Sequence, residues 1–284
     1  MVIAHSPDAD DIFMYYAIKF GWVGKENTVF ENIALDIETL NTEALKGTYD
    51  ITAISFGLYP HIRADYALLR TAVSFGQGYG PKLIRKKETV LKKRFKVALS
   101  GKFTTNALLF RIAYPDAKII YMNFLEIEQA VLDGVVDAGV LIHESILGYD
   151  DSLEVERELW DVWCELSGGE LPLPVGGMAI RRSLPITSAI EYENILTKAV
   201  QIARDHKETL SKMLMERNLV RIDAPTLEKY LELYANDESI TLNETQYKAI
   251  ELLFDLGYKH GFFDAKIDPR EFMIPLEYTE LRYS

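Results

Sequence analysis

The chain has 284 residues, of which 48% are hydrophobic and 26% are charged, a composition typical of a globular protein with a sizeable core. Its formal net charge of −12 argues against a duplex nucleic-acid binder, which needs a broad basic face. The single cysteine, Cys164, excludes an internal disulfide and any metal site built from several thiolates.

The N-terminal stretch MVIAHSPDADD has neither a basic start nor a long apolar segment. We therefore expect no secretory signal here. The sequence also contains no run of about 18 apolar residues, so we predict no membrane-spanning helix and no membrane partner. Together these features favour a cytoplasmic protein.

The first 150 residues alternate short apolar runs with amphipathic segments. This rhythm is typical of parallel sheets covered by helices. The expected strands are residues 1–5, 33–39, 50–55, 66–75, 80–87, 95–100, 117–122 and 136–142. The expected helices are residues 10–22, 41–47, 55–64, 104–114 and 123–134.

The last hundred residues have apolar side chains at helical spacing. They predict three longer helices, over residues 188–206, 223–235 and 243–257. Asp223 is expected to cap the second of these helices, and Asn243 with Gln246 resembles a capping box for the third. We interpret the aromatic residues of these helices as core.

Two strand-like segments, residues 79–87 and 173–182, stand outside this rhythm. Each is rich in glycine and proline and ends in paired basic residues, and together they bracket a complete βαβαβ block. This pattern predicts an α/β fold of two lobes joined by two hinge strands, with a ligand cleft between them. Residues 1–82 and 180–284 would form a large discontinuous lobe, and residues 83–179 a small lobe. The alternative is one large α/β sheet with a helical tail.

Polar side chains follow four of the predicted strands. In open α/β sheets, ligands bind beyond the carboxyl ends of the strands, so these side chains are candidates for one site. They are His5, Ser6, Asp8, Asp10 and Asp11 after the first strand, Ser55 after the third, Lys102, Thr104, Thr105 and Asn106 after residues 95–100, and His143, Glu144 and Ser145 after residues 136–142.

Thr104 and Thr105 stand where a helix is expected to begin. Backbone N–H groups and hydroxyls at a helix start can hold a carboxylate, although one threonine could simply be an N-cap. The preceding SGKFTTN lacks the spacing of a phosphate loop. Ser6 is interpreted as the N-cap of the first helix, placed where it can also touch a ligand.

His143 is the candidate catalyst. A histidine at a helix start is expected to have a lowered pKa and to stay neutral, as a general base near pH 7 must. Glu144 would be either an acid in the first helical turn or a partner in proton transfer. Asp8, Asp10 and Asp11 lack the spacing of a calcium loop, so we predict no metal site.

Six linked segments carry a family resemblance: HSPDADDIFMYYAI, LDIETLNTEALKGTYDITAISFGLYP, GYGPKLI, GKFTTNALL, DAGVLIHES and LPLPVGGMAIRR. Together they resemble the 1,4-dihydroxy-6-naphthoate synthase family of the futalosine route to menaquinone, from residue 3 to about residue 182. The resemblance implies a fold similar to type-II periplasmic binding proteins. It also implies a cytoplasmic lyase that cleaves a carbon–carbon bond of cyclic dehypoxanthine futalosine without a cofactor.

The resemblance also implies roles for individual residues. His143 would be the base, and Ser55, Thr104 and Thr105 would carry hydroxyls that contact the ligand. Ser6, Asp11 and Glu144 are further binding candidates because they follow strand ends. The chain departs from the family's common SPCPND, because Asp8 replaces a cysteine and Asp10 an asparagine. This departure puts in doubt any amide-specific contact at position 10.

Two other functions remain open at this point. One is a solute-binding protein for a small carboxylate, and the other is a chorismate dehydratase of the same pathway. The missing signal weighs against the first, and the GKFTT and LIHES motifs weigh against the second. The sequence leaves open whether the protein is a monomer or a homodimer.

Overall fold

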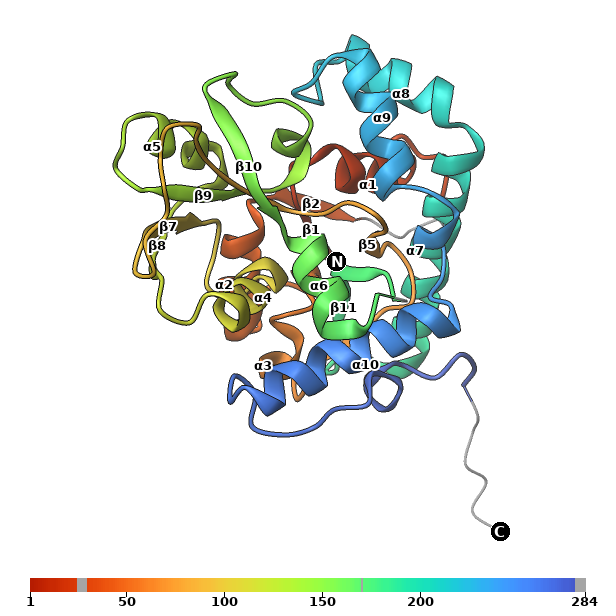
Figure 1. The fold of residues 1–284 in the computed structure, drawn as a ribbon. Helices are drawn as coiled ribbons and strands as arrows, with labels where there is room; N and C mark the ends of the chain where they lie inside the picture. The colour runs from red at the N-terminus through yellow and green to blue at the C-terminus, as the bar shows by residue number, and fades with distance from the viewer. Residues whose placement is uncertain (25–29, 170, 279–284) are drawn as a thin grey trace.

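The structure is a computed structural model that describes residues 1–24, 30–169 and 171–278. Two separate mixed sheets, each with helices packed against it, account for the strands of these residues (Figure 1). The predicted two-lobed α/β fold is therefore confirmed.

The larger sheet has the strand order β2-β1-β3-β11-β4, with β5 also paired to β11. β1 runs parallel to β2 and β3, whereas β11 is antiparallel to β3, β4 and β5. All five residues of β3 are buried, as expected for an apolar strand covered on both faces. The strands are β1 Val2–His5, β2 Glu31–Ala34, β3 Ile51–Ser55, β4 Tyr66–Leu68, β5 Ser74–Gly76 and β11 Leu173–Arg181.

The smaller sheet has the order β10-β6-β9-β7-β8. Its strands β8, β7 and β9 are parallel, whereas β6 pairs antiparallel with both β9 and β10. Helix α5 (Ile127–Leu132) packs closely on β9, where a Cβ on Gly139 would collide with Ile127. The strands are β6 Lys82–Lys86, β7 Lys96–Leu99, β8 Lys118–Tyr121, β9 Ala138–Leu141 and β10 Leu153–Glu158.

The chain crosses between the sheets twice. It leaves the larger sheet after β5 and enters the smaller sheet at β6, then returns from β10 through helix α6 (Leu159–Ser167) to β11. The two strands that we interpreted as hinges thus each belong to one sheet. β11 joins the larger sheet from Leu173, which is before the predicted lobe boundary at residue 180. The lobe boundaries themselves stay a prediction.

Two predicted strands were too long. Residues 66–75 were expected to form one strand, but they divide into β4 and β5, with residues 69–73 outside both. Residues 33–39 were expected to be extended, but β2 ends at Ala34 and helix α2 (Ile37–Lys46) follows almost at once. The cause is Asp36, whose carboxylate accepts a hydrogen bond from Thr39 N at 3.1 Å and caps the helix. The helix ends at Gly47, which has the left-handed conformation that glycine adopts at low cost.

Helices cover the larger sheet and form the C-terminal part. Helix α1 packs on α7 and α9, and α10 packs on β11 (Figure 1). The cap at Asp223 and the capping box of Asn243 with Gln246 are confirmed. The helices are α1 Ala9–Lys19, α3 Tyr59–Ile62, α4 Thr105–Ala113, α7 Ile186–Asp205, α8 Lys207–Glu216, α9 Ala224–Tyr234 and α10 Glu244–Lys259. Within the described residues, none of the helices is both long and apolar enough to span a membrane.

Candidate active site

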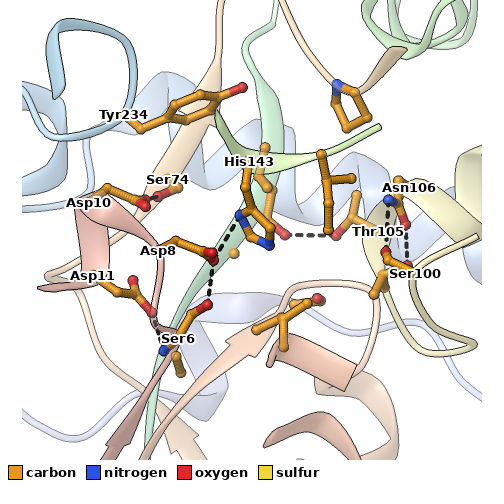
Figure 2. Close-up of a pocket in the computed structure, with 18 of the residues that line it drawn as sticks. Ser6, Asp8, Asp10, Asp11, Ser74, Ser100, Thr105, Asn106, His143 and Tyr234 are labelled. Carbon is orange, nitrogen blue, oxygen red and sulfur yellow. Dashed lines mark hydrogen bonds and ion pairs between the residues drawn. The ribbon is translucent and has the colours of Figure 1, made fainter. Parts of the chain in front are cut away.

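A cavity lies where the carboxyl ends of β1, β3, β7 and β9 face one another (Figure 2). Residues of both sheets line it, so the site is shared between the lobes. One part of its wall carries acids and His143, and another carries hydroxyl and amide side chains. Apolar residues close the remainder: Ile37, Ile54, Leu109, Ile142, Ile146, Leu159, Leu173 and Val175.

The structure brings most of the predicted site residues into this one cavity. Its lining includes Ser6, Asp11, Ser55, Thr104, Thr105 and His143. Glu144 lies just beside the cavity, against the start of α1. Strand ends far apart in the sequence therefore do meet, as the sheet topology required.

Asp8 and His143 form an ion pair at the centre of the site. Nδ1 of His143 lies 2.8 Å from Oδ2 of Asp8, and the side chain of Asp8 is 1% exposed. The hydroxyl of Ser6 donates to the same oxygen, and Nη2 of Arg221 lies 3.1 Å from the other oxygen. Burial raises the pKa of Asp8, but His143, Ser6 and Arg221 outweigh it and hold the pKa below its ordinary value.

The predicted neutral state of His143 is wrong. Burial lowers its pKa, but the charge and hydrogen bond of Asp8, with the charges of Glu144 and Asp10, raise the pKa to about 9. The segment after β9 is a short 3-10 helix, His143–Ile146, so the dipole that we expected to keep the ring neutral is small. At neutral pH the resting site therefore holds an imidazolium.

The other ring nitrogen of His143 is not engaged by any residue that the structure describes. Nε2 is inaccessible to solvent and has no hydrogen-bond partner among the described residues. The ring of Phe124 packs against His143 in a T-shaped arrangement, at a centroid distance of 5.0 Å, and helps to fix the imidazole ring. The backbone φ of His143 is 54°, a conformation uncommon for residues other than glycine. The ring is thus held from several sides while one nitrogen faces the cavity.

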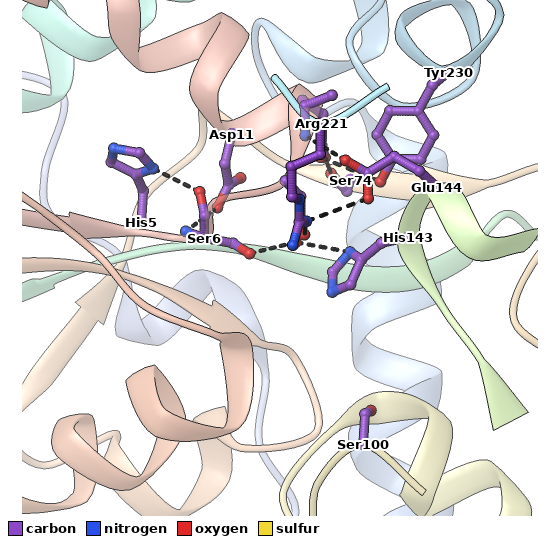
Figure 3. A network of polar contacts seen from close by, with 12 residues as sticks. His5, Ser6, Asp11, Ser74, Ser100, His143, Glu144, Arg221 and Tyr230 are labelled. Carbon is purple, nitrogen blue, oxygen red and sulfur yellow. Dashed lines mark hydrogen bonds and ion pairs between the residues drawn. The ribbon is translucent and has the colours of Figure 1, made fainter. Parts of the chain in front are cut away.

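Glu144 is an anchor between the lobes rather than a partner of the imidazole ring. Its Oε1 accepts a hydrogen bond from Ala9 N at 3.2 Å, at the first turn of α1 (Figure 3). Its Oε2 lies 3.6 Å from Nη2 of Arg221. Burial and the charge of Asp8 raise the pKa of Glu144.

The two neighbouring acids occupy different settings. Asp10 accepts hydrogen bonds from Ser74 Oγ at 2.9 Å and from Tyr230 OH at 3.3 Å, and burial with the charge of Asp8 raises its pKa to about 6. Asp11 accepts from Ser6 N at 2.7 Å, and burial raises its pKa well above the ordinary value. Asp11 therefore fixes the turn through its hydrogen bond from Ser6 N.

The interpretation of Ser6 as a helix cap was wrong. The N-cap position of α1 is Asp8, and the hydroxyl of Ser6 donates to the Asp8 carboxylate. Ser6 therefore helps to hold the acid of the ion pair. The short Asp8 side chain is already occupied by His143 and Arg221, and it makes no hydrogen bond to the helix.

The hydroxyls of both threonines are engaged within the protein. Thr104 caps α4 by accepting from Ala107 N at 3.2 Å. Thr105 accepts from Gly57 N at 3.0 Å and donates to the carbonyl of Val175 at 2.9 Å, both in the larger lobe. An anion at this end would therefore meet the backbone N–H groups of the first turn rather than these hydroxyls.

The sequence reasoning missed part of the lining. Ser100 directly follows β7, and Ser55 ends β3, so the strand-end rule could have found Ser100 as well. Its hydroxyl accepts from Asn106 Nδ2 at 3.4 Å, and Ser55 Oγ accepts from Asn41 Nδ2 at 3.2 Å. These contacts leave both hydroxyl protons available to a ligand.

Tyr230 and Tyr234 of α9 also line the cavity, although we interpreted them only as core. Arg221 comes from the connection between α8 and α9 and follows no motif. Among the described residues, no three His, Cys, Asp or Glu side chains are arranged to hold a metal ion.

Comparison with known proteins places the chain among relatives of one pathway. The sequence pattern of a family described as menaquinone biosynthesis matches residues 1–259. A 1,4-dihydroxy-6-naphthoate synthase of Streptomyces coelicolor is 30% identical over 270 residues, which cover 93% of this chain and 94% of the relative. The enzyme of the same name from Thermus thermophilus is 27% identical and covers 96% and 98%.

Solved structures agree with the fold. A protein of Archaeoglobus fulgidus is 34% identical and superposes with a TM-score of 0.85 over 92% of this chain and 98% of its own. The periplasmic aliphatic sulphonate binding protein of Escherichia coli is 15% identical, with a TM-score of 0.66 over 100% of this chain and 96% of its own. The second likeness concerns the fold alone.

Proposed function

The chain belongs to the menaquinone biosynthesis family, and we propose that it is a 1,4-dihydroxy-6-naphthoate synthase that cleaves a carbon–carbon bond of cyclic dehypoxanthine futalosine. In this proposal the sugar-derived fragment leaves and the dihydroxynaphthoate remains. His143 takes the proton whose loss starts the cleavage.

The observation that carries the proposal is the pairing of His143. Its Nδ1 is fixed by Asp8, whereas its buried Nε2 has no partner in the described chain and faces the cavity. A base held by a carboxylate on one nitrogen is oriented for proton transfer at the other. When Nε2 takes a proton, the Asp8 carboxylate stabilises the imidazolium that forms.

The rest of the cavity supports an aromatic acid as substrate. Apolar side chains such as Ile37 and Leu109 offer flat contact to a naphthalene-sized ring. The first turn of α4, with Ser55 and Ser100 nearby, offers N–H and O–H donors to the carboxylate. The acids beside His143 would then face the sugar-derived part.

The direct test is to mix the purified protein with cyclic dehypoxanthine futalosine and to measure 1,4-dihydroxy-6-naphthoate by mass spectrometry. Product that accumulates in proportion to enzyme supports the proposal. Chorismate in a parallel reaction tests the sister activity, and turnover of chorismate alone would overturn the assignment. Tight binding of the futalosine compound with no product would instead indicate a binding protein.

A cytoplasmic setting, a carboxylate-bearing small molecule as partner and a reaction without a cofactor all belong to this proposal. The choice between monomer and homodimer stays open.

A further inference from the structure

Arg221 is a charged residue at the cleft that neither the sequence motifs nor the proposed reaction explains. It lies between α8 and α9, in the C-terminal helical part, and its side chain is 38% exposed. Figure 3 shows it reaching in among Ser6, His143 and Glu144. Its position at the rim distinguishes it from the buried groups that face the substrate.

The contacts of Arg221 join three parts of the chain. Nη2 lies 3.1 Å from Oδ1 of Asp8, after β1, and 3.6 Å from Oε2 of Glu144, after β9. The guanidinium also lies over the ring of Phe124, 5.3 Å from its centroid, and this ring packs against His143. One side chain therefore contacts the acid of the ion pair, the interlobe anchor and the ring that supports the base.

We propose that Arg221 is a positioning residue, which holds Asp8 and Glu144 in place across the cleft and balances their charge on His143. The proposal rests on the proposed function, because it assigns Arg221 a role in that same site. Arg221 touches none of the atoms that would react, and it acts through Asp8 and Glu144.

The electrostatic argument follows from what faces His143. From the turn before α1 and its first residues come Asp8, Asp10 and Asp11, from its own turn comes Glu144, and from α9 comes Tyr230. These groups are acidic, and in the described part of the cleft Arg221 is the cation that contacts two of them. The carboxylates of Asp8 and Glu144 raise the pKa of His143. The positive charge of Arg221, which lies beside both carboxylates, partly cancels this effect.

Removal of the Arg221 charge should therefore raise the pKa of His143. Asp8 and Glu144 would act on the ring without a counter-charge, and the connection before α9 would lose its anchor on the cleft. The free-base form of His143 would become rarer at neutral pH. We expect about a threefold to tenfold loss of kcat/KM at pH 7, which corresponds to an upward shift of about half to one pH unit.

The test is a titration of the imidazole carbons by NMR in the full-length protein labelled with carbon-13 histidine. The samples are the wild type, Arg221→Gln, Arg221→Met and Arg221→Lys, with His143→Gln to assign the signal. The matched control is Arg217→Gln, because Arg217 lies in the same connection but packs over Phe20, 4.5 Å from its centroid, away from the cleft.

The expected result is a higher titration midpoint of His143 in the Gln and Met variants. The Lys variant and the Arg217 control should stay close to the wild type, and circular dichroism should show that all variants are folded. Unchanged midpoints in both neutral variants would overturn the proposal. Unfolding of both would also overturn it, because Arg221 would then be a structural residue.

This measurement needs no substrate, so it separates the inference from the proposed function. A protein that makes no dihydroxynaphthoate can still show the shift of His143. A protein that makes the product with an unshifted His143 in both neutral variants keeps the function and loses the role of Arg221. The pH profile of kcat/KM, where product is made, should move in the same direction as the NMR midpoint.

Discussion

Asp8 and His143 pair at 2.8 Å although one follows a strand of the larger sheet and the other a strand of the smaller sheet. The ion pair therefore depends on the two lobes lying against each other. Because the pair forms only when the lobes are in contact, closure of the cleft also affects the protonation of the candidate base, His143.

The first prediction concerns pH. Because the pKa of His143 is raised to about 9, its base form grows as pH rises, so kcat/KM should rise about tenfold per unit below pH 9 and then level off. Asp8→Asn removes the largest raising influence and leaves burial, which lowers the pKa. The rise of kcat/KM should then occur at lower pH. A rise at the same pH as in the wild type would contradict the role of Asp8.

The same pair should affect stability. The folded pKa of His143 lies above the ordinary 6.5, so its stabilisation is complete below pH 6.5 and is lost as pH rises through about 9. The loss amounts to about 3 kcal/mol at most. Urea unfolding at pH 6 and pH 9 measures it, and the difference should shrink in His143→Gln. An equal pH dependence in both proteins would show that the pair does not stabilise the fold.

His143→Ala should abolish most turnover. Loss of a general base typically costs between about a hundredfold and ten-thousandfold in kcat, whereas substrate contacts elsewhere in the cavity remain. Isothermal titration should therefore still detect binding. His260→Ala is the control, since His260 ends α10 away from the cavity. A His143→Ala enzyme with near wild-type kcat would remove His143 from the mechanism.

Substitutions of the two threonines should have different effects, on stability for Thr104 and on substrate binding for Thr105. Thr104→Ala removes a helix cap and should cost about 1 kcal/mol of unfolding free energy, with Thr104→Ser close to wild type. Thr105→Val removes the contacts to Gly57 and Val175 and should raise KM more than it lowers stability. Chemical unfolding and steady-state kinetics measure both. A KM effect confined to Thr104 would reverse these assignments.

Gly101→Ala should disturb the contact between the lobes at the other end of the cleft. A Cβ at this position would collide with the carboxylate of Glu38, which accepts from Lys102 N at 2.7 Å and Phe103 N at 3.3 Å. We expect weaker substrate binding in a folded protein. Gly148→Ala is the matched control, because a Cβ there meets nothing within 4 Å. Equal affinities in the two variants would show that this contact is dispensable.

Much of the fold could be predicted because the spacing of apolar residues and the capping residues of helices are local signals in the sequence. The strand-end rule also gathered Ser55, Thr105 and His143 correctly, since the carboxyl ends of parallel strands lie at one edge of each sheet and these edges of the two sheets face the same cavity. The strand predicted over residues 33–39 failed where Asp36, a single capping side chain, overrode the apolar pattern.

The charge state of the site could not be predicted. The pKa of His143 depends on Asp8, which lies far away in sequence and reaches the ring only through the packing of two lobes. Arg221 stands in a helical connection with no motif, so its approach to Asp8 is a purely tertiary result. Long-range contacts of this kind leave no periodicity or spacing in the chain.

The backbone at His143 suits glycine better than histidine. A backbone φ of 54° costs a residue other than glycine about 1–2 kcal/mol of conformational free energy, and glycine avoids this cost. A designer who sought only a sturdier scaffold would place glycine here and replace Asp8 with an uncharged residue, so that no buried charge lost its partner. Position 143 is thus a local stability–activity trade-off, in which the protein tolerates a conformational penalty to present one imidazole edge to the cavity.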